Sequence, residues 1–511
     1  MSLNLATLLT ESTKRNPAKT AIIFDDFRMT YAELQGASNK FANVLQQNGL
    51  QRGQKVAIML PNVPQFVICY YGTLKAGGVV VPLNVLLKAP EVTYHVKDSD
   101  AVAVIAWEGF AEQALAGFKE ATDCHTLWLV NSPGSSATPD AEGIRNYNSD
   151  MATASPVFDM VQTMPDDTAV ILYTSGTTGH PKGAELTHFN MFFNARCSID
   201  FLGIQWRPDD VMLVTLPLFH AFGQSSVMNV GIGVGCALTL MARFDPVRAF
   251  QVIERDRVTK FSGVPTMYFY LLNHPDRTKY DLSSLEAANS GGAAIPVEIL
   301  NRWEQTFGFK ILEGYGLSET SPTASFNVMY KEPKAGSIGI PTWGVDFKIV
   351  DEDDNEVPVG EPGELLIRGH CVMKGYYKRP QATAEALRGG WFHSGDVATR
   401  DEDGYFYIVD RKKDMLIRGG FNVYPREIEE VLYAHPAIAE AAVIGIPDQA
   451  LGEEVKAFVV LKEGSYATAD EIREFTKAQL AAYKYPRHIE IWTEPLPKNA
   501  TGKILKRELR T

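Results

Sequence analysis

The sequence predicts an α/β protein with three regions in series, and three observations support this. Residues 1–165, and again the residues from 211 onward, alternate helix-like and strand-like segments, which is typical of a mainly parallel sheet covered by helices. After about residue 336 the segments become β-rich, and the last hundred residues look like a small α+β unit. The charged run 410–414 (Asp-Arg-Lys-Lys-Asp) separates the last two regions. We therefore expect a large N-terminal domain (1–410) of α/β subdomains plus a β-rich subdomain, a hinge (411–413) and a small C-terminal α+β domain (414–511).

The first region can be followed segment by segment. Residues 31–48 have the apolar spacing of a helix and are followed by Gly49, a common helix terminator. Residues 132–140 are rich in Ser, Pro and Gly and are expected to form a loose surface loop. The remaining expectations are a helix at 65–76 and strands at 55–60, 79–82 and 168–172.

The later regions give similar expectations. Residues 220–242 contain no Asp, Glu, Lys or Arg, but their glycines and polar residues suit a buried helix followed by a strand better than a membrane span. The remaining expectations for residues 211–312 are strands at 211–216, 260–263 and 309–312 and a helix at 249–256. Further on, we expect a hairpin that joins 397–399 to 405–409, a helix beginning at Pro425, strands at 441–444 and 456–461, and a helix at 469–482.

Composition excludes several classes of protein. The 511 residues are 45% hydrophobic and 22% charged, which is ordinary for a soluble globular chain without an integral membrane segment. The net charge of -12 argues against a general nucleic-acid binder. The five cysteines are far apart and lack Cys-x-x-Cys spacing, and the N-terminus lacks a signal-peptide pattern. We therefore expect a reducing, cytoplasmic location.

The stretch 173–183 is the strongest local signal in the chain. It reads Tyr-Thr-Ser-Gly-Thr-Thr-Gly-His-Pro-Lys-Gly and directly follows the expected strand 168–172. Small residues let backbone N–H groups approach an anion, and hydroxyls and a lysine add further donors, so the stretch predicts a phosphate-binding loop. It is not a Walker A loop, because Lys182 precedes Gly183 and the Gly-x-x-x-x-Gly-Lys-Ser/Thr order is absent. A polar surface loop is the alternative.

Taken together, the motifs resemble those of the adenylate-forming superfamily of acyl-CoA synthetases, adenylation domains and luciferases, and most closely those of bacterial fatty acyl-CoA and aryl-CoA ligases. The resemblance spans nearly the whole chain, through residues 173–183, 217–223, 313–320, 391–396, 410–414, 419–427 and 497–503. It implies an enzyme in which a carboxylate attacks the α-phosphate of ATP, giving an acyl-adenylate that is then transferred to coenzyme A. It also implies Mg²⁺ as cofactor, a mobile C-terminal lid, and a homodimer.

The resemblance assigns roles to particular residues. Thr174 and Glu319 would place Mg²⁺, although Glu319 taken alone would be read as a helix-start carboxylate. Asp396 and Arg411 would hold the ribose, although a turn aspartate is the alternative for Asp396. The other residues expected around the nucleotide are Ser175, Gly176, Thr177, Thr178, Gly179 and Lys182 at the phosphates, and Gly291, Glu313, Gly314, Tyr315, Gly316 and Thr320 near the adenine.

Two poses of the C-terminal domain are implied. In the first, Lys503 would bridge the acyl carboxylate and the α-phosphate. His220 would lie in the pocket near the acyl carboxylate and the channel for pantetheine. Rotation about Lys413 would then withdraw Lys503 and bring Gly419 and Gly420 to the site, opening a channel for pantetheine. A solvated lysine and a core histidine are the alternatives for Lys503 and His220.

The identity of the acid is approached through the segments expected to wall its pocket. Residues 220–242, 264–269 and 289–294 contain no charged side chain, which favours a medium- to long-chain fatty acid over a dicarboxylate. Gly231, Gly233 and Gly235 are expected to leave room for a long slot beside a helix. The alternatives are an aryl acid of the cinnamate, coumarate, phenylacetate or benzoate type, an enzyme that loads a separate carrier protein, and a luciferase-like oxygenase.

Overall fold

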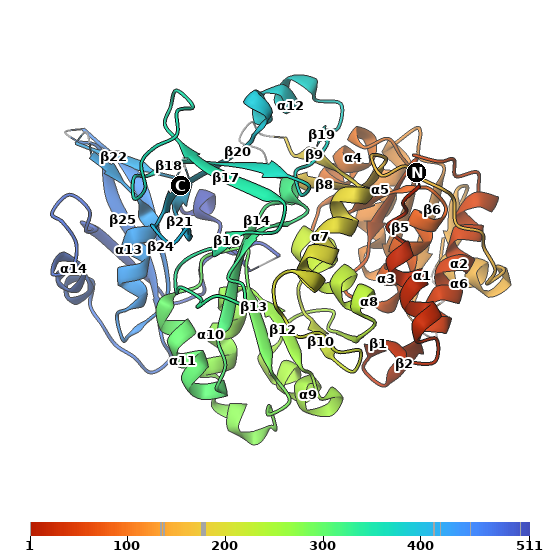
Figure 1. Cartoon of the computed structure of the whole chain (residues 1–511), viewed down its shortest axis with the longest axis horizontal. Helices are drawn as coiled ribbons and strands as arrows, with labels where there is room; N and C mark the ends of the chain where they lie inside the picture. Colours follow the sequence, from red (N-terminus) through yellow and green to blue (C-terminus); the bar gives the residue numbers. More distant parts are fainter. Residues whose placement is uncertain are drawn as a thin grey trace.

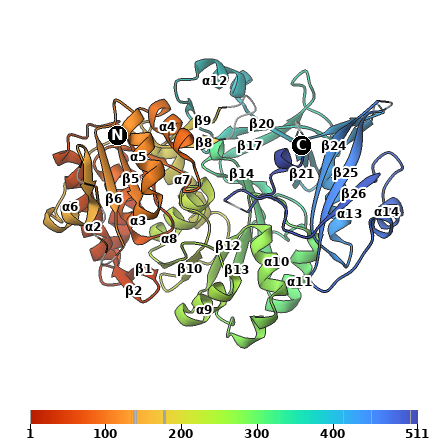
Figure 2. The same ribbon diagram turned by 180° about the vertical axis from the view of Figure 1, so that it is seen from behind.

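The computed structural model describes residues 2–132, 135, 138–139, 141–174, 180–411, 414–419, 421–449, 451–500 and 502–510. The N-terminal segments and the C-terminal segments lie at opposite ends of the longest axis, and the segment from β10 to α11 lies between them (Figure 1). The view from behind shows the same order (Figure 2). The α/β architecture predicted for the N-terminal region is confirmed, as are the β-rich subdomain and the smaller C-terminal domain.

The first sheet carries the glycine-rich stretch. Its central strands β3, β4, β5 and β6 are parallel, as predicted, and β9 runs antiparallel to β8. The sheet order is β19 (Gly375–Tyr376), β9 (Lys182–Thr187), β8 (Thr168–Thr174), β4 (Val79–Pro82), β3 (Lys55–Met59), β5 (Ala101–Trp107), β6 (Thr126–Val130) and β7 (Ile144–Asn146). The accompanying helices are α2 (Tyr31–Gln47), α3 (Pro64–Lys75), α4 (Ala89–Asp98), α5 (Ala111–Glu120) and α6 (Tyr147–Thr153).

Both faces of this sheet are buried. Along β3, Val56 and Ile58 face the large central core, and the alternating Ala57 and Met59 face a second core on the side of α4 and α5. A strand buried on both faces reads as a continuous apolar run, which is why β3 and β4 were predicted from the sequence.

The second sheet brings together segments that are distant in the sequence. Its order is β16 (Ile340–Pro341), β15 (Thr323–Phe326), β14 (Ile311–Gly316), β13 (Ala287–Ser290), β12 (Lys260–Gly263), β10 (Val211–Val214), β11 (Ala237–Leu240), β1 (Thr20–Phe24) and β2 (Phe27–Thr30). Strands β10 to β14 are parallel, so their carboxyl ends share one edge. The accompanying helices are α1 (Thr7–Arg15), α7 (His188–Asp200), α8 (Val230–Val234), α9 (Pro246–Asp256), α10 (Pro265–Asn273) and α11 (Val297–Phe307).

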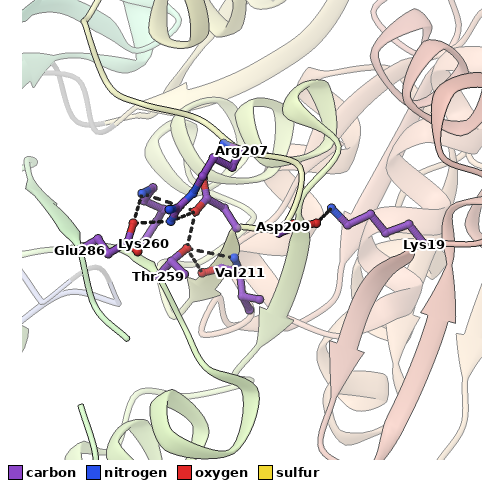
Figure 3. Close-up of polar contacts among 8 residues, drawn as sticks. Lys19, Arg207, Asp209, Val211, Thr259, Lys260 and Glu286 are labelled. Carbon is purple, nitrogen blue, oxygen red and sulfur yellow. Dashed lines mark hydrogen bonds and ion pairs between the residues drawn. The ribbon is translucent and has the colours of Figure 1, made fainter. Parts of the chain in front are cut away.

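An ion cluster lies at the amino end of this sheet (Figure 3). The buried carboxylate of Asp210 accepts hydrogen bonds from the Arg207 backbone N–H (2.8 Å) and the Thr259 hydroxyl (2.8 Å), and lies 3.5 Å from the Lys260 ammonium. Burial raises the pKa of Asp210, but these bonds and the Lys260 charge outweigh burial and leave its pKa below the usual value. Asp210 is thus a structural carboxylate that ties β10 to β12.

The remaining elements form the β-rich subdomain and the C-terminal unit, which we define as residues 414–511. The β-rich subdomain is an antiparallel sheet of β17 (Val345–Val350), β18 (Gly363–Gly369), β20 (Phe392–Arg400) and β21 (Phe406–Arg411), with α12 (Pro380–Ala386) nearby. The C-terminal unit contains β22 (Leu416–Arg418), β23 (Phe421–Val423), α13 (Pro425–Tyr433), β24 (Ile438–Asp448), β25 (Gly452–Leu461), α14 (Ala469–Lys477) and β26 (His488–Trp492). It has apolar cores of its own, built on β24 and β25.

Most of the local elements agree with the expectations from the sequence. The helix at Pro425 and the hairpin of β20 and β21 are confirmed, and the helix expected to reach residue 482 ends at Lys477. The charge-free run 220–242 forms a π-helix, η2 (Phe222–Asn229), followed by α8 and β11. All five cysteines are buried and unpaired. No helix in the described part of the chain is long and apolar enough to cross a lipid bilayer.

Candidate active site

One large cavity lies where the two N-terminal sheets, the β-rich subdomain and the C-terminal unit meet. Its volume is about 1870 Å³. It is lined by the carboxyl ends of β8, β12, β13 and β14 and by the segment after β10. Ligands of open α/β sheets bind at this edge, because the loops that follow the strands converge there.

Thr174, the last residue of β8, lines the cavity and is the last residue of the stretch 173–183 that the structure describes before residue 180. The Thr174 hydroxyl donates a hydrogen bond to Oε1 of Glu319 (3.1 Å), and the Tyr376 hydroxyl donates to the same oxygen (3.0 Å). Lys182, the first residue of β9, lies 5.4 Å from the centroid of the Tyr376 ring. Ser175, Gly176, Thr177, Thr178 and Gly179 lie outside the described residues.

This cluster can be tested as a Mg²⁺ site. Glu319 is buried. The burial of Tyr376, and then the negative charge of Glu319, raise the pKa of the Tyr376 phenol, so the phenol stays protonated and donates. One carboxylate beside a hydroxyl is a donor set that suits Mg²⁺ held jointly by protein, phosphate oxygens and water. The residues present therefore fit the ion expected at Thr174 and Glu319. Tyr376 was not identified from the sequence, because it lies more than fifty residues from Glu319 and belongs to no local pattern.

The predicted ribose residues are brought together by strand register. Asp396 on β20 is paired with Arg411 on β21, and Nε of Arg411 lies 3.3 Å from Oδ1 of Asp396. The Tyr315 hydroxyl donates to Oδ2 of Asp396 (2.5 Å). Burial first, and the Asp396 charge second, raise the pKa of Tyr315. The sequence suggested only a stacking face for Tyr315, so this link between the two nucleotide segments is new.

The expected adenine segment lines the cavity at Gly291, Glu313, Gly314, Tyr315 and Gly316. Burial raises the pKa of Glu313 to about 8, against the opposing charge of Arg426 from the C-terminal unit. Its Oε1 accepts a long hydrogen bond from the Ile295 N–H (3.4 Å). The structure does not bring the side chain of Thr320 to the cavity: it is fully buried and its hydroxyl donates to the Pro322 carbonyl (2.6 Å).

His220 and Lys503 approach each other from different domains. Nδ1 of His220 accepts the Phe222 N–H (3.2 Å), so the neutral ring carries its proton on Nε2. Burial, and then the positive charge of Lys503, lower the pKa of His220 to about 4. Next to Lys503, Gly502 has φ +81°, and a Cβ there would lie 3.0 Å from the Thr266 hydroxyl. A glycine at this position lets the C-terminal segment lie against α10.

Gly419, one of the residues expected at the cavity in the second pose, does not line it. Gly419 occupies the turn between β22 and β23 with φ +58°, and its N–H donates to the Leu451 carbonyl (2.8 Å). Lys413 and Gly420 lie outside the described residues. The structure thus holds Lys503, and not Gly419, at the cavity.

The expected acyl wall is partly corrected. His220, Phe222 and Ser226 line the cavity, as do residues 264–266, Phe269 and 289–294. The prediction that glycines in α8 leave room for a slot is wrong. An added Cβ on Gly231 would lie 2.5 Å from Leu238, one on Gly233 would meet Ile199, and Gly235 ends the helix with φ +90°.

A wall segment that the sequence did not reveal comes from the end of α7 and the loop after it. Ser198, Leu202, Ile204 and Trp206 line the cavity together with Phe326 of β15. Ser198 lies in the last turn of α7, three of these residues follow the helix, and none belongs to a motif, so only the tertiary structure identifies them.

Comparison with known proteins agrees with this geometry. Residues 9–377 match the model of the AMP-binding enzyme family, and residues 427–503 match the AMP-binding enzyme C-terminal domain. The chain belongs to the AMP-binding enzyme family. It is 40% identical to a long-chain-fatty-acid–CoA ligase of Bacillus subtilis (strain 168), over 99% of this chain and 94% of the relative.

Two further proteins that resemble this chain are named for aromatic acids. A feruloyl-CoA synthase of an Amycolatopsis species is 39% identical over 97% of this chain and 96% of its own length. The solved structure of the anthranilate CoA ligase AuaEII, in complex with anthranoyl-AMP, superposes with a TM-score of 0.92 at 29% identity. It covers 99% of this chain and 96% of that one.

Proposed function

We infer that this family member is an AMP-forming acyl-CoA ligase that uses ATP and coenzyme A, with Mg²⁺ as its metal ion. The observation that carries the inference is that three groups face one cavity: the Thr174–Glu319 pair, the Asp396–Arg411–Tyr315 cluster, and Lys503 beside His220. An adenylating enzyme needs these three elements to hold phosphates, ribose and the reacting carboxylate.

In the first half-reaction, a carboxylate oxygen of the acid attacks the α-phosphorus of ATP and pyrophosphate leaves. Two anions must be brought together, so positioning and charge neutralisation supply most of the rate. We propose that Asp396 accepts the ribose hydroxyls, that Lys182 contacts the departing phosphates, and that Lys503 neutralises the attacking carboxylate and the α-phosphate. Bound Mg²⁺ would add positive charge beside Thr174 and Glu319.

In the second half-reaction, the thiol of coenzyme A attacks the acyl carbonyl and AMP leaves. We propose that the C-terminal unit rotates about residues 411–413, with Lys413 as pivot, so that Lys503 withdraws and Gly419 and Gly420 approach the cavity. The neutral ring of His220 would then border the thiol channel. A thiol with a pKa of about 8.5 is already a few per cent thiolate at neutral pH, so no further base is required.

For the acid, we propose a medium- to long-chain fatty acid. Charge-free cavity walls at His220, Phe222, Trp206 and Phe326 favour an apolar tail, and each buried methylene contributes about 0.8 kcal/mol. A dicarboxylate would bury a second charge without a partner at a cost of several kcal/mol. The name and 40% identity of the Bacillus relative support the same class. We propose a cytoplasmic location, and a homodimer stays a prediction from the resemblance.

The second candidate is an aryl-CoA ligase, which the feruloyl-CoA synthase favours at nearly equal identity. An enzyme that loads a separate carrier protein is a further alternative, since pantetheine is the acceptor in both cases. ATP–pyrophosphate exchange against straight-chain acids of four to sixteen carbons, cinnamate and benzoate tests all of these, with coenzyme A or a carrier protein then added. We expect kcat/KM to rise through at least eight carbons. A clear maximum on an aryl acid, with little response to chain length, would overturn the fatty-acid proposal.

A further inference from the structure

Lys503 is carried by a short hairpin, which we call the Lys503 hairpin (residues 497–500 and 502–505). The Leu505 N–H donates to the Pro497 carbonyl (2.8 Å), and the Asn499 N–H donates to the Lys503 carbonyl (2.9 Å). The Lys503 N–H in turn donates to the side-chain Oδ1 of Asn499 (2.9 Å). Bonds across the two arms hold the hairpin in shape, so a constraint on one arm also positions Lys503 on the other.

The first arm is held by Glu440, a buried residue of β24. Oε2 of Glu440 accepts the backbone N–H of Leu496 (3.0 Å), directly before the hairpin. Oε1 accepts the ammonium of Lys498 (2.5 Å), within the hairpin. The side chains of Glu440 and Lys498 are only 8% and 16% exposed, so this charge-assisted pair is largely shielded from water.

The same carboxylate reaches across to the N-terminal domain. The Tyr270 hydroxyl, on α10, donates to Oε1 of Glu440 over 3.4 Å, and the Lys498 ammonium lies 5.7 Å from the centroid of the Tyr270 ring. Tyr270 and Glu440 both line the cavity. Glu440 therefore joins three parts: the C-terminal sheet, the Lys503 hairpin and the helix against which Gly502 lies.

We propose that Glu440 is a positioning residue for adenylation, which acts by anchoring the Lys503 hairpin on α10 so that Lys503 enters the cavity beside His220. The proposal rests on the proposed function, since it assigns Glu440 to one of the two half-reactions. The contact between Glu440 and Tyr270 joins the C-terminal unit to α10, so it belongs to the pose in which Lys503 is at the cavity. Glu440 should thus influence the reaction of the acid with ATP and have little effect on thioester formation.

The physical basis is the precision that catalysis requires. Lys498 and Lys503 have flexible side chains, and a hairpin anchored only by its backbone would leave the ammonium of Lys503 free to move. A displacement of about 1 Å at a reacting group costs about 10²-fold in rate. The ion pair restricts the hairpin at a point five residues from Lys503 in the sequence, on the facing arm.

The experiment measures the two half-reactions separately in the full-length enzyme. ATP–pyrophosphate exchange reports adenylation, with the acid that gives the fastest exchange in the wild type. Thioester formation is measured with the synthetic adenylate of that acid and coenzyme A. For Glu440→Gln we expect the kcat of exchange to fall by about 10²-fold. We expect thioester formation to stay within about twofold, the scatter of a surface substitution.

Two additional variants identify the path of the effect. Lys498→Met removes the other partner and keeps the side-chain length, and it should reproduce the split between half-reactions. The double variant should be no worse than either single variant, because both act through one contact. Tyr270→Phe removes only the hydroxyl and should slow exchange by about three- to tenfold, because its hydrogen bond to the Glu440 carboxylate is long (3.4 Å) and therefore weak.

Glu490→Gln is the matched control. Glu490 lies on β26 of the same unit, pairs with Lys456 (2.7 Å) and accepts the Trp492 indole N–H (2.8 Å), and these contacts stay within the C-terminal unit. It should leave both half-reactions unchanged. If Glu440→Gln lowers both half-reactions equally, Glu440 acts only through the stability of the fold and the proposal fails. If exchange is unchanged, Glu440 does not position Lys503 for adenylation. If wild-type exchange is absent with every acid, the proposed function fails instead.

Discussion

At the scale of single residues, the cavity is built from side chains whose partners come from distant segments. Asp396 shows this best, because one oxygen faces Arg411 and the other accepts the hydroxyl of Tyr315, a residue of a different sheet. A buried carboxylate that is held on both oxygens has little freedom to turn. In the proposed function, this fixed carboxylate would accept the two adjacent hydroxyl groups of the ribose.

This arrangement predicts the effect of Asp396→Asn. The asparagine amide accepts hydrogen bonds on one side only and leaves the Arg411 charge unpaired. We expect the KM for ATP to rise by about 10- to 100-fold, which is the effect of losing one charge-assisted contact. Exchange kinetics as a function of ATP concentration measure this. Asp346→Asn, which removes an exposed pair with Arg368, is the control and should leave KM unchanged. A normal KM in Asp396→Asn would remove the residue from the nucleotide site.

Lys503 gives a second prediction at this scale. Lys503→Ala should lower adenylation by about 10²–10³-fold, the effect of one lost contact to developing transition-state charge. Thioester formation from supplied acyl-adenylate should persist, because the ammonium has left the cavity in the proposed second pose. Equal loss in both half-reactions would contradict the two-pose proposal.

At the scale of elements, the start of α7 links the end of β9 in the first sheet to the N-terminal segment. Thr187 caps the helix, and Nδ1 of the buried His188 accepts the backbone N–H of Leu5 (3.0 Å). Burial lowers the pKa of His188 to about 4, against the opposing charge of Asp167. Protonation would abolish this acceptor and place a charge in the core.

The pH dependence of stability follows from this shift. In the unfolded chain His188 binds a proton near pH 6.5, whereas in the folded chain it does so only near pH 4. The contribution of the neutral ring to the free energy of unfolding is therefore complete above pH 6.5 and is lost as the pH falls. Between pH 7 and 5 we expect a loss of about 2 kcal/mol from this residue. Urea unfolding midpoints at several pH values measure it. His188→Gln keeps an acceptor without a titration and should flatten the slope; an unchanged slope would contradict the assignment.

The sequence predicted best those helices and strands whose signal lies within their own residues. The strands at 79–82 and 260–263 were predicted to the residue, and both are fully buried. Residues 79–82 form a continuous apolar run, which is the local signal of such a strand. The partnership of β1 with β11 was not predictable, since it joins residues more than two hundred positions apart. The glycines of α8 were misinterpreted for the same reason: they pack against Leu238 and Ile199, which no local pattern places there.

The same division applies to the site. Thr174, Glu319, Asp396 and Lys503 belong to recognisable motifs, and the structure brings them to one cavity. Tyr376 and Glu440 belong to none, and only the tertiary structure shows that they contact Glu319 and Lys498. Residues that bind a ligand leave a pattern in sequence, whereas residues that position them depend on the fold.

At the scale of the whole molecule, the two-pose proposal requires the C-terminal unit to change its position against the rest of the chain. We expect Lys413→Pro to restrict rotation, because proline fixes φ near −65° and removes an N–H. Pyrophosphate release should continue in the pose that holds Lys503 at the cavity, and transfer to coenzyme A should be lost. Single-turnover measurements of the two steps test this. Unimpaired overall turnover would reject Lys413 as the pivot.

The burial of every cysteine has a practical consequence at the same scale. Burial raises the pKa of the thiols of Cys124, Cys197, Cys236 and Cys371 to about 12, and that of Cys69 is raised as well. A buried thiol with so little thiolate reacts slowly with an aromatic disulfide reagent. The folded enzyme should therefore be silent in a colorimetric sulfhydryl assay, so that the decline of the colour reports coenzyme A consumption alone. Any colour that develops slowly from the protein's own thiols would measure the fraction of molecules that have unfolded.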